Sequence, residues 1–256
     1  MQHAYHISEN LKRLRLPGML YNLEIRSKEA RDNNLGYMEF LSLLVQDELI
    51  SRESNNLAKR LKAAGFGIEK TFEGYDFSFN SDIFPSALIR DLATCRFLEN
   101  KQNLVIAGRP GIGKTHIVKA LGHEMCRRGH NVMFKKTTDL LSSLAGFSTK
   151  GERLLKKCIS VDLLILDDFA FRKLDQKESE CLYAIADERL SRRPVLITSN
   201  RPPEDWYECF PDQVIGGAIL DRLISGSQKI ITTKGDSFRR KNGVNLNKVL
   251  DNIKPE

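Results

Sequence analysis

The chain has 256 residues, 41% of them hydrophobic and 29% charged, with a net charge of +7, which is typical of a globular protein of one large and one small domain. No apolar run approaches the roughly 20 residues needed to cross a bilayer, and the amino terminus lacks the apolar core of a signal peptide, so no membrane partner is expected. The five cysteines lack the spacing of a zinc site, which favours free thiols in a reducing cytoplasm.

Residues 1–64 are predicted to form a small all-helical domain. Apolar residues recur at helical spacing on both sides of Pro17-Gly18 and again over residues 37–61. The sequence Asn33-Asn34-Leu35-Gly36 predicts a turn between these two stretches. About three helices are therefore expected before residues 65–82, where three glycines and five aromatic residues predict an extended linker.

Residues 83–256 alternate between short apolar strands and helices. The clearest helices cover residues 116–128 and 175–192, and the second is expected to open with a capping box formed by Asp175 and Glu178. Strands joined by helical crossovers are parallel, and their sheet is covered on both faces. The prediction is an α/β fold with a five-stranded parallel sheet, its strands at residues 104–107, 131–134, 163–166, 195–198 and 229–232.

The first of these strands runs directly into the phosphate-loop pattern G-x-x-x-x-G-K-[ST]. Its glycines allow a tight turn that approaches phosphates closely, and the amino terminus of the next helix attracts an anion. Lys114 is expected to reach the β- and γ-phosphates, and the Thr115 hydroxyl to ligate Mg²⁺. The pattern predicts a nucleoside triphosphate site, formed by Gly108, Arg109, Pro110, Gly111, Ile112, Gly113, Lys114, Thr115 and His116.

Polar residues at two further strand ends are predicted to complete this site. The third strand ends in Asp167-Asp168, and the carboxyl ends of parallel strands face the nucleotide in such folds. Asp167 is expected to hold Mg²⁺, and Asp168 to orient or deprotonate the attacking water. Asn200, after the fourth strand, is expected to lie beside the γ-phosphate and hold that water. The structural alternatives are carboxylates that cap the next helix and an Asn that only forms a turn.

The positive charge is concentrated in one part of the chain. Residues 76–160 hold 14 basic and 7 acidic side chains, whereas the segments before and after are nearly neutral. A basic cluster suits a polyanion such as DNA, and solvated helix faces are the alternative. The cluster consists of Lys135, Lys136, Lys150, Arg153, Lys156 and Lys157, and further basic groups lie at residues 12–15 and 229–248.

Several motifs together resemble the AAA+ ATPases of the initiator and helicase-loader branch, and more closely the IstB-like ATP-binding proteins of insertion sequences. Beside the phosphate loop and Leu-Leu-Ile-Leu-Asp-Asp, these motifs are Thr-Ser-Asn at 198–200, Gly-Gly-Ala-Ile-Leu-Asp-Arg-Leu at 216–223 and Gly-Asp-Ser-Phe-Arg at 235–239. The resemblance covers nearly the whole chain. It implies that residues 1–64 bind DNA or a partner, and that residues 83–256 form an AAA+ ATPase domain. The chain departs from many AAA+ proteins in that few residues follow the last predicted strand, so a truncated or absent lid is expected.

The resemblance also implies roles for two arginines. Arg222 would be an arginine finger that enters the nucleotide site of a neighbouring subunit, and Arg239 would be a sensor arginine; both would be catalytic, together with Asp168 and Asn200. A guanidinium near the γ-phosphate stabilises transition-state charge, whereas a surface pair of Arg222 with Asp221 is the alternative. Asp167-Asp168 departs from the Asp-Glu that the family commonly carries, and the shorter acid is expected to slow hydrolysis.

The function implied by the resemblance is that of a helper ATPase in insertion-sequence transposition. Such a protein uses ATP and Mg²⁺, works in the bacterial cytoplasm, forms a homo-oligomer on double-stranded DNA and engages its cognate transposase. A DnaC-type helicase loader is the main alternative, and it would act on a protein through its amino-terminal domain. A small-molecule kinase shares the phosphate loop but would need a substrate pocket. No Asn-Lys-x-Asp guanine signature follows any strand, which argues against a GTPase.

Overall fold

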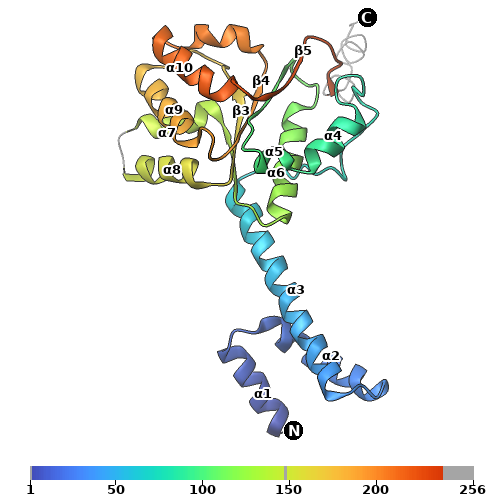
Figure 1. The fold of residues 1–256 in the computed structure, drawn as a ribbon. Helices are drawn as coiled ribbons and strands as arrows, with labels where there is room; N and C mark the ends of the chain where they lie inside the picture. The colour runs from blue at the N-terminus through green and yellow to red at the C-terminus, as the bar shows by residue number, and fades with distance from the viewer. Residues whose placement is uncertain (1, 147–148, 239–256) are drawn as a thin grey trace, which may run out of the picture. The chain divides into compact units, whose positions relative to one another are not determined.

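The structure, a computed structural model, describes residues 2–146 and 149–238 and divides into two compact units, Met1–Lys59 and Arg60–Glu256. The first unit holds α1 (Gln2–Arg13), α2 (Pro17–Asp32) and most of α3 (Tyr37–Ala64) (Figure 1). Pro17 stands in the first turn of α2, where its missing N–H costs no helical hydrogen bond. The predicted amino-terminal helical region is confirmed.

A close approach between α2 and α3 holds the first unit together. Gly18 is buried there, and a side chain at this position would lie only 2.5 Å from the carbonyl oxygen of Asp47. The Glu48 carboxylate accepts hydrogen bonds from the backbone N–H groups of Gly18 at 2.8 Å and Met19 at 3.3 Å, which satisfies the first turn of α2. Arg26 donates two hydrogen bonds to Asp47, both of 2.8 Å, so its guanidinium serves the fold.

The second unit is built on a parallel sheet with the strand order β2-β3-β4-β1-β5, which confirms the predicted fold class. Its central strands are buried along their whole length because helices cover both faces, and their runs of Leu, Ile and Val suit that setting. The strands are β1 (Leu104–Gly108), β2 (Val132–Lys136), β3 (Leu163–Phe169), β4 (Val195–Ser199) and β5 (Gln228–Thr232).

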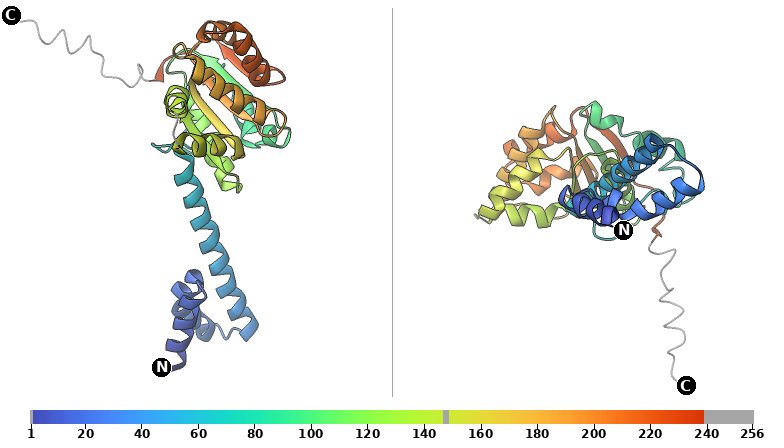
Figure 2. Two further views of the ribbon diagram at one scale, coloured as in Figure 1. Left: turned by 90° about the vertical axis from the view of Figure 1, so that its left-hand side faces the viewer. Right: turned by 90° about the horizontal axis from the view of Figure 1, so that it is seen from below.

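The two faces of the sheet carry different helices (Figures 1 and 2). On one face, α6 (Lys114–Arg127) packs against the sheet and α4 (Ser86–Ala93) packs against α6. The other face is covered by α7 (Thr137–Ala145), α8 (Thr149–Ser160), α9 (Gln176–Arg189) and α10 (Gln213–Ile224). The predicted capping box is present, with Asp175 and Glu178 at the start of α9. The shorter elements are α5 (Arg96–Glu99) and the 3₁₀ helix η1 (Pro203–Cys209).

Residues 65–82 differ from the extended linker predicted for them. They form bends and turns, and the aromatic side chains of Phe66, Tyr75 and Phe79 are buried within the second unit. Phe66 stacks on His123 of α6 with 4.5 Å between ring centroids, in space that Gly122 leaves open. Burial of large aromatic surface therefore fixes this segment against α6. No helix among the described residues has the length and apolar content to span a bilayer.

Candidate nucleotide-binding site

The phosphate-loop sequence lies between the end of β1 at Gly108 and the start of α6 at Lys114. Gly111 and Gly113 have φ angles of 88° and 109°, a left-handed conformation that only glycine adopts at little cost. A side chain at Gly108 would meet the carbonyl oxygen of Thr232 at 2.8 Å, so β5 also requires a glycine there. Ile112 is fully buried and anchors the loop to the core. The amino terminus of α6 consequently opens directly onto the loop, as anion binding requires.

Lys114 is held in place by three acceptors of its own chain. Its ammonium donates hydrogen bonds to the carbonyl oxygens of Gly108 at 2.7 Å and Arg109 at 2.9 Å, and to the amide oxygen of Asn200 at 2.8 Å. The side chain is largely buried, so its charge acts in a low-dielectric setting. Lys114 and Asn200 are 86 residues apart in the sequence, and they meet at the carboxyl-terminal ends of the parallel strands.

Thr115 and Asp167 place three oxygen atoms side by side. The Thr115 hydroxyl donates to the Asp167 carboxylate, with distances of 3.0 and 3.2 Å to its two oxygens, and the Thr198 hydroxyl also donates to that carboxylate. Asp167 is 2% exposed, and this burial raises the pKa of its carboxyl group, an effect that Thr198 partly offsets. A nearby cation would relieve the cost of holding this carboxylate ionised.

Asp168 is turned out of the regular strand toward Asn200. The pairing of β3 with β4 shifts register between Leu166 and Phe169, and Asp168 has a left-handed φ of 55° within this irregularity. Its backbone N–H donates to the Thr198 hydroxyl at 3.1 Å, and its carboxylate accepts from the Asn200 amide at 3.3 Å. Such a strained backbone persists where neighbouring groups fix it, and it is common at active sites.

The donor set fits a nucleotide-bound Mg²⁺ ion. Mg²⁺ prefers hard oxygen ligands and usually binds through one or two protein groups together with the phosphates of its substrate. The Thr115 hydroxyl and the Asp167 carboxylate supply such oxygens beside the phosphate loop. Among the described residues, no group of three or more His, Cys, Asp or Glu side chains could hold a metal ion by itself. A cation here would therefore depend on phosphate oxygens for its remaining ligands.

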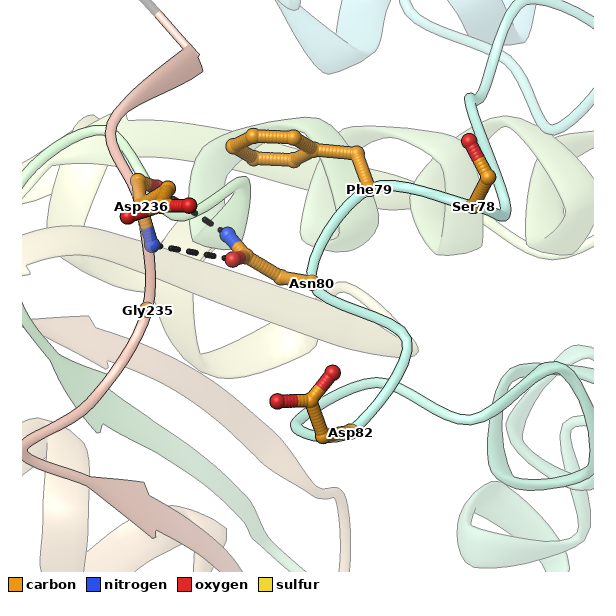
Figure 3. Close-up of a pocket in the computed structure, with 6 residues that line it drawn as sticks. All are labelled: Ser78, Phe79, Asn80, Asp82, Gly235 and Asp236. Atoms are coloured by element: carbon orange, nitrogen blue, oxygen red, sulfur yellow. Dashed lines mark hydrogen bonds between the residues drawn. The ribbon is translucent and has the colours of Figure 1, made fainter.

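Two segments that are remote in sequence meet at Asn80 and Asp236 (Figure 3), and the Asn80 amide also donates to the Ile112 carbonyl of the phosphate loop at 3.4 Å. The Asn80 amide accepts from the Asp236 N–H at 2.9 Å and donates to the Asp236 carbonyl at 3.0 Å. Asn80 and Asp236 line a cavity of about 410 Å³ together with Ser78, Phe79, Asp82 and Gly235. Phe238 donates its N–H to the Gly111 carbonyl at 3.0 Å, which brings the chain directly over the loop.

His116, the last residue of the predicted nucleotide-binding set, joins the segment 65–82 to α6. One ring nitrogen lies 3.0 Å from the Thr71 carbonyl oxygen, and the ring meets Tyr75 edge to face with 5.2 Å between centroids. Burial lowers the pKa of His116, which favours its neutral form near pH 7. The neutral imidazole therefore serves as a packing and hydrogen-bonding group beside the loop.

Arg222 lies at the opposite edge of the sheet from the phosphate loop. The Asn103 amide donates to the Arg222 carbonyl at 3.2 Å, and the Asn103 oxygen accepts from Val195, the first residue of β4. Because a strand rises about 3.3 Å per residue, the two ends of β1 are separated by roughly 13 Å. The side chain pairs with Asp187 and not with Asp221 as the alternative had it. Arg239 lies outside the described residues.

Comparison with known proteins identifies the family. Residues 9–245 match the family described as IstB-like ATP binding protein. An insertion-sequence ATP-binding protein of Mycobacterium tuberculosis is 41% identical over 233 residues, which cover 90% of this chain and 92% of the relative. An IS21 ATP-binding protein of Pseudomonas aeruginosa is 34% identical over 233 residues, with coverages of 90% and 87%. The chain belongs to the IstB-like ATP-binding proteins.

Solved structures resemble a large part of this IstB-like protein. The DnaC helicase loader has a TM-score of 0.52 at 20% identity, covering 68% of this chain and 99% of that one. AMPPCP-bound DnaA from Aquifex aeolicus has a TM-score of 0.55 at 19% identity, with coverages of 73% and 60%. At such low identity the likeness concerns the fold alone. It agrees with the predicted α/β fold, in which helices cover a five-stranded parallel sheet.

Sequence reasoning missed several residues that shape the site of this IstB-like protein. Thr198 contacts both acidic residues, whereas it entered the prediction only as part of the Thr-Ser-Asn motif, in which Asn200 was assigned the role at the site. Asn103 joins α10 to β4, and its position before β1 was the available signal. The contact of Asn80 could not be predicted from the sequence, because Asn80 lies in the segment predicted to be a linker and its partner Asp236 is 156 residues away.

Proposed function

We propose that the protein is a Mg²⁺-dependent ATPase. The observation that carries the proposal is the connection of Lys114 to Asp168 through the single side chain of Asn200. A lysine for the phosphates, a carboxylate for the water and an amide between them are the groups that phosphoryl transfer to water requires. Their convergence at one edge of the sheet is unexpected for residues with only structural roles.

Each polar group at this edge has a distinct task in the proposed reaction. Lys114 and the loop N–H groups bind the β- and γ-phosphates, while Thr115 and Asp167 would hold Mg²⁺. Bound Mg²⁺ would neutralise phosphate charge. The Asp168 carboxylate orients the attacking water and accepts its proton, and Asn200 fixes the position of Asp168. A small-molecule kinase has less support, because Asp168 and Asn200 are assigned to the attacking water and none of these groups is assigned to a second substrate.

Hydrolysis is proposed to be completed between subunits. Arg222 lies near the amino-terminal ends of the parallel strands, whereas Lys114 follows the carboxyl-terminal end of β1. The Arg222 guanidinium is therefore far from the phosphate loop of its own chain. In a homo-oligomer, the amino-terminal strand ends of one chain can face the phosphate loop of the next chain. Such an arrangement would bring Arg222 of the first chain to the nucleotide of the second. An arginine supplied in trans raises turnover by about 10³-fold or more in related chemistry.

The proposed setting is insertion-sequence transposition on double-stranded DNA. The relatives are named as ATP-binding proteins of insertion sequences, and α8 exposes Lys150, Arg153, Lys156 and Lys157. An exposed basic helix suits a duplex backbone. The proposal includes ATP-promoted assembly on DNA, engagement of a cognate transposase and a cytoplasmic location. A DnaC-type loader remains the second candidate, since the DnaC helicase loader shares this fold.

A single set of assays tests the proposal. ATP hydrolysis and calorimetric ATP binding would be measured for Lys114→Ala and Asp168→Asn, with the exposed Lys62→Ala and Asp205→Asn as matched controls. Lys114→Ala should lose binding, whereas Asp168→Asn should bind ATP without turnover. Wild-type turnover in Asp168→Asn would remove Asp168 from the mechanism. Failure of the wild type to bind duplex DNA at low salt would favour the loader.

A further inference from the structure

The Arg222 guanidinium is held by three groups of its own subunit. Its Nε–H donates to the Asp187 carboxylate at 2.8 Å, its Nη1 donates to the Ala218 carbonyl at 2.9 Å, and its Nη2 donates to the Tyr183 hydroxyl at 3.1 Å. The guanidinium carbon also lies 4.8 Å from the centroid of the Tyr183 ring. Tyr183 and Asp187 are one helical turn apart on α9, so they present their polar groups on the same face.

These contacts leave part of the guanidinium available. Arginine has five N–H donors, one on Nε and two on each terminal nitrogen. Three of them have partners among the residues that the structure describes, which leaves one N–H on Nη1 and one on Nη2. The Arg222 side chain is 23% exposed, so this end of the group is partly reachable from solvent. Two adjacent N–H groups in a rigid plane match the spacing of two phosphate oxygens.

Stability alone gives little reason for this arrangement. The Asp187 side chain is 49% exposed, and ion pairs at such sites contribute little to folding because water already solvates both charges. The packing of α10 beside α9 rests on buried apolar residues, among them Leu220 and Leu223 of α10 and Ile185 of α9. The polar contacts to Arg222 therefore do little for the helix pair, and they restrict chiefly the direction of the guanidinium.

We propose that Tyr183 and Asp187 are positioning residues that aim Arg222 at the nucleotide phosphates bound by a neighbouring copy of this chain. The inference rests on the proposed role of Arg222 in trans. An unrestrained arginine samples many rotamers, and fixing it in advance removes that cost from the reaction. Loss of one restraint is expected to reduce turnover by about 3- to 10-fold, the range for ordering one long side chain.

The test uses two inactive variants that complement each other. Asp168→Asn keeps Arg222 but lacks the carboxylate for water, and Arg222→Ala keeps the nucleotide site but lacks the finger. A mixture of the two should regain ATP hydrolysis at mixed interfaces. Asp187→Ala or Tyr183→Phe is then added to one chain of the pair at a time. The control is Glu188→Ala, which removes an exposed carboxylate that pairs with Arg192 instead.

The expected result depends on which chain carries the added change. On the finger-donating Asp168→Asn chain, Asp187→Ala and Tyr183→Phe should each lower the regained turnover by about 3- to 10-fold with an unchanged KM for ATP. On the Arg222→Ala chain the same changes should have no effect. Asp187→Asn on the finger-donating chain should restore most of the turnover, because its amide oxygen still accepts from Nε. Unfolding midpoints of all chains would show that each variant is folded.

Three outcomes would overturn the inference. Equal losses on both chains would mean that α9 acts through general structure. Unchanged turnover would mean that Arg222 needs no restraint, and increased turnover with Asp187→Ala would make Asp187 a competitor for the guanidinium. In all three the parent mixture is active, so the trans role of Arg222 stands. An inactive parent mixture whose chains co-assemble would instead reject the trans role and the inference with it.

Discussion

The amide oxygen of Asn200 accepts a hydrogen bond of 2.8 Å from the ammonium of Lys114. The two residues come from the end of β4 and the start of α6, so the contact crosses from one strand end to the phosphate loop. The other end of the same amide donates to Asp168 at 3.3 Å. A phosphate that draws Lys114 toward itself would therefore change the surroundings of Asn200 and, through it, of Asp168.

Replacement of Asn200 by Ala should separate ATP binding from hydrolysis. Lys114 keeps its two carbonyl partners in this variant, so the dissociation constant for ATP should change little. Turnover should fall by roughly 10²-fold, the usual effect of removing one preorganised polar group from an active site. Calorimetry and steady-state ATPase assays would measure both, with the exposed Asn55→Ala as control. A proportional loss of binding and turnover would contradict the proposed role.

Replacement of Asp167 by Asn should stabilise the nucleotide-free protein near neutral pH. Burial raises the pKa of the Asp167 carboxyl group, so the folded chain binds this proton more tightly than the unfolded chain does. The free energy of unfolding of the wild type therefore falls as pH rises from the ordinary Asp pKa, about 4, through the higher folded value. Below about pH 4 the carboxyl group is protonated in both the folded and the unfolded chain, so burial of its charge no longer destabilises the fold.

Thermal unfolding of Asp167→Asn and wild type across pH would check this dependence. The variant should have the higher midpoint at neutral pH, and the difference should shrink in acid. It should also lose Mg²⁺-dependent ATP binding, since an amide is a weaker ligand than a carboxylate. Equal pH profiles for the two proteins would show that burial of Asp167 imposes no cost.

The parts of the site that depend on neighbouring residues in the sequence could be predicted, and the parts that depend on contacts between distant residues could not. The phosphate loop, Asp167-Asp168 and the five strands depend on local patterns, and the structure has strands at all five places. Residues 65–82 were misread because their glycines resemble a linker, whereas burial of Phe66 and Tyr75 depends on α6, which lies far ahead in sequence. The environment of Arg189 was equally invisible, because an arginine in a helix is normally exposed.

Substitution of Arg189 by Met should destabilise the second unit strongly. The side chain is 2% exposed and donates to five backbone carbonyls, with the shortest distances of 2.7 Å to Cys158 and to Pro194. Burial lowers the pKa of Arg189 to about 10, so the group remains charged at neutral pH. Met fills similar volume but leaves these carbonyls without donors, at a cost of roughly 3 kcal/mol or more.

The unfolding midpoint of Arg189→Met should fall by about 6 °C or more, since each kcal/mol shifts it by about 2–4 °C in a domain of this size. Arg192→Met is the matched control, because Arg192 is exposed three residues further along the chain and its guanidinium pairs with the exposed Glu188. A shift as small as that of the control would mean that water replaces Arg189 at the carbonyls.

Charge reversal on α8 should weaken binding to duplex DNA of any sequence. Leu154, Leu155 and Cys158 turn one side of α8 toward the core, which leaves Lys156 and Lys157 exposed. Each phosphate contact contributes about 0.9 to the slope of log affinity against log salt. Lys156→Glu combined with Lys157→Glu should therefore lower affinity and flatten this slope by about 2 if both side chains contact phosphates.

Fluorescence anisotropy over a range of salt concentrations, with and without a non-hydrolysable ATP analogue, would measure these slopes. The control is Lys62→Glu combined with Lys173→Glu, which changes the net charge equally but lies outside α8. ATP should strengthen wild-type binding, because assembled subunits present several copies of α8 to one duplex and bind multivalently. If the control pair flattens the slope as much as the α8 pair does, net charge alone accounts for binding, and α8 is not the contact surface.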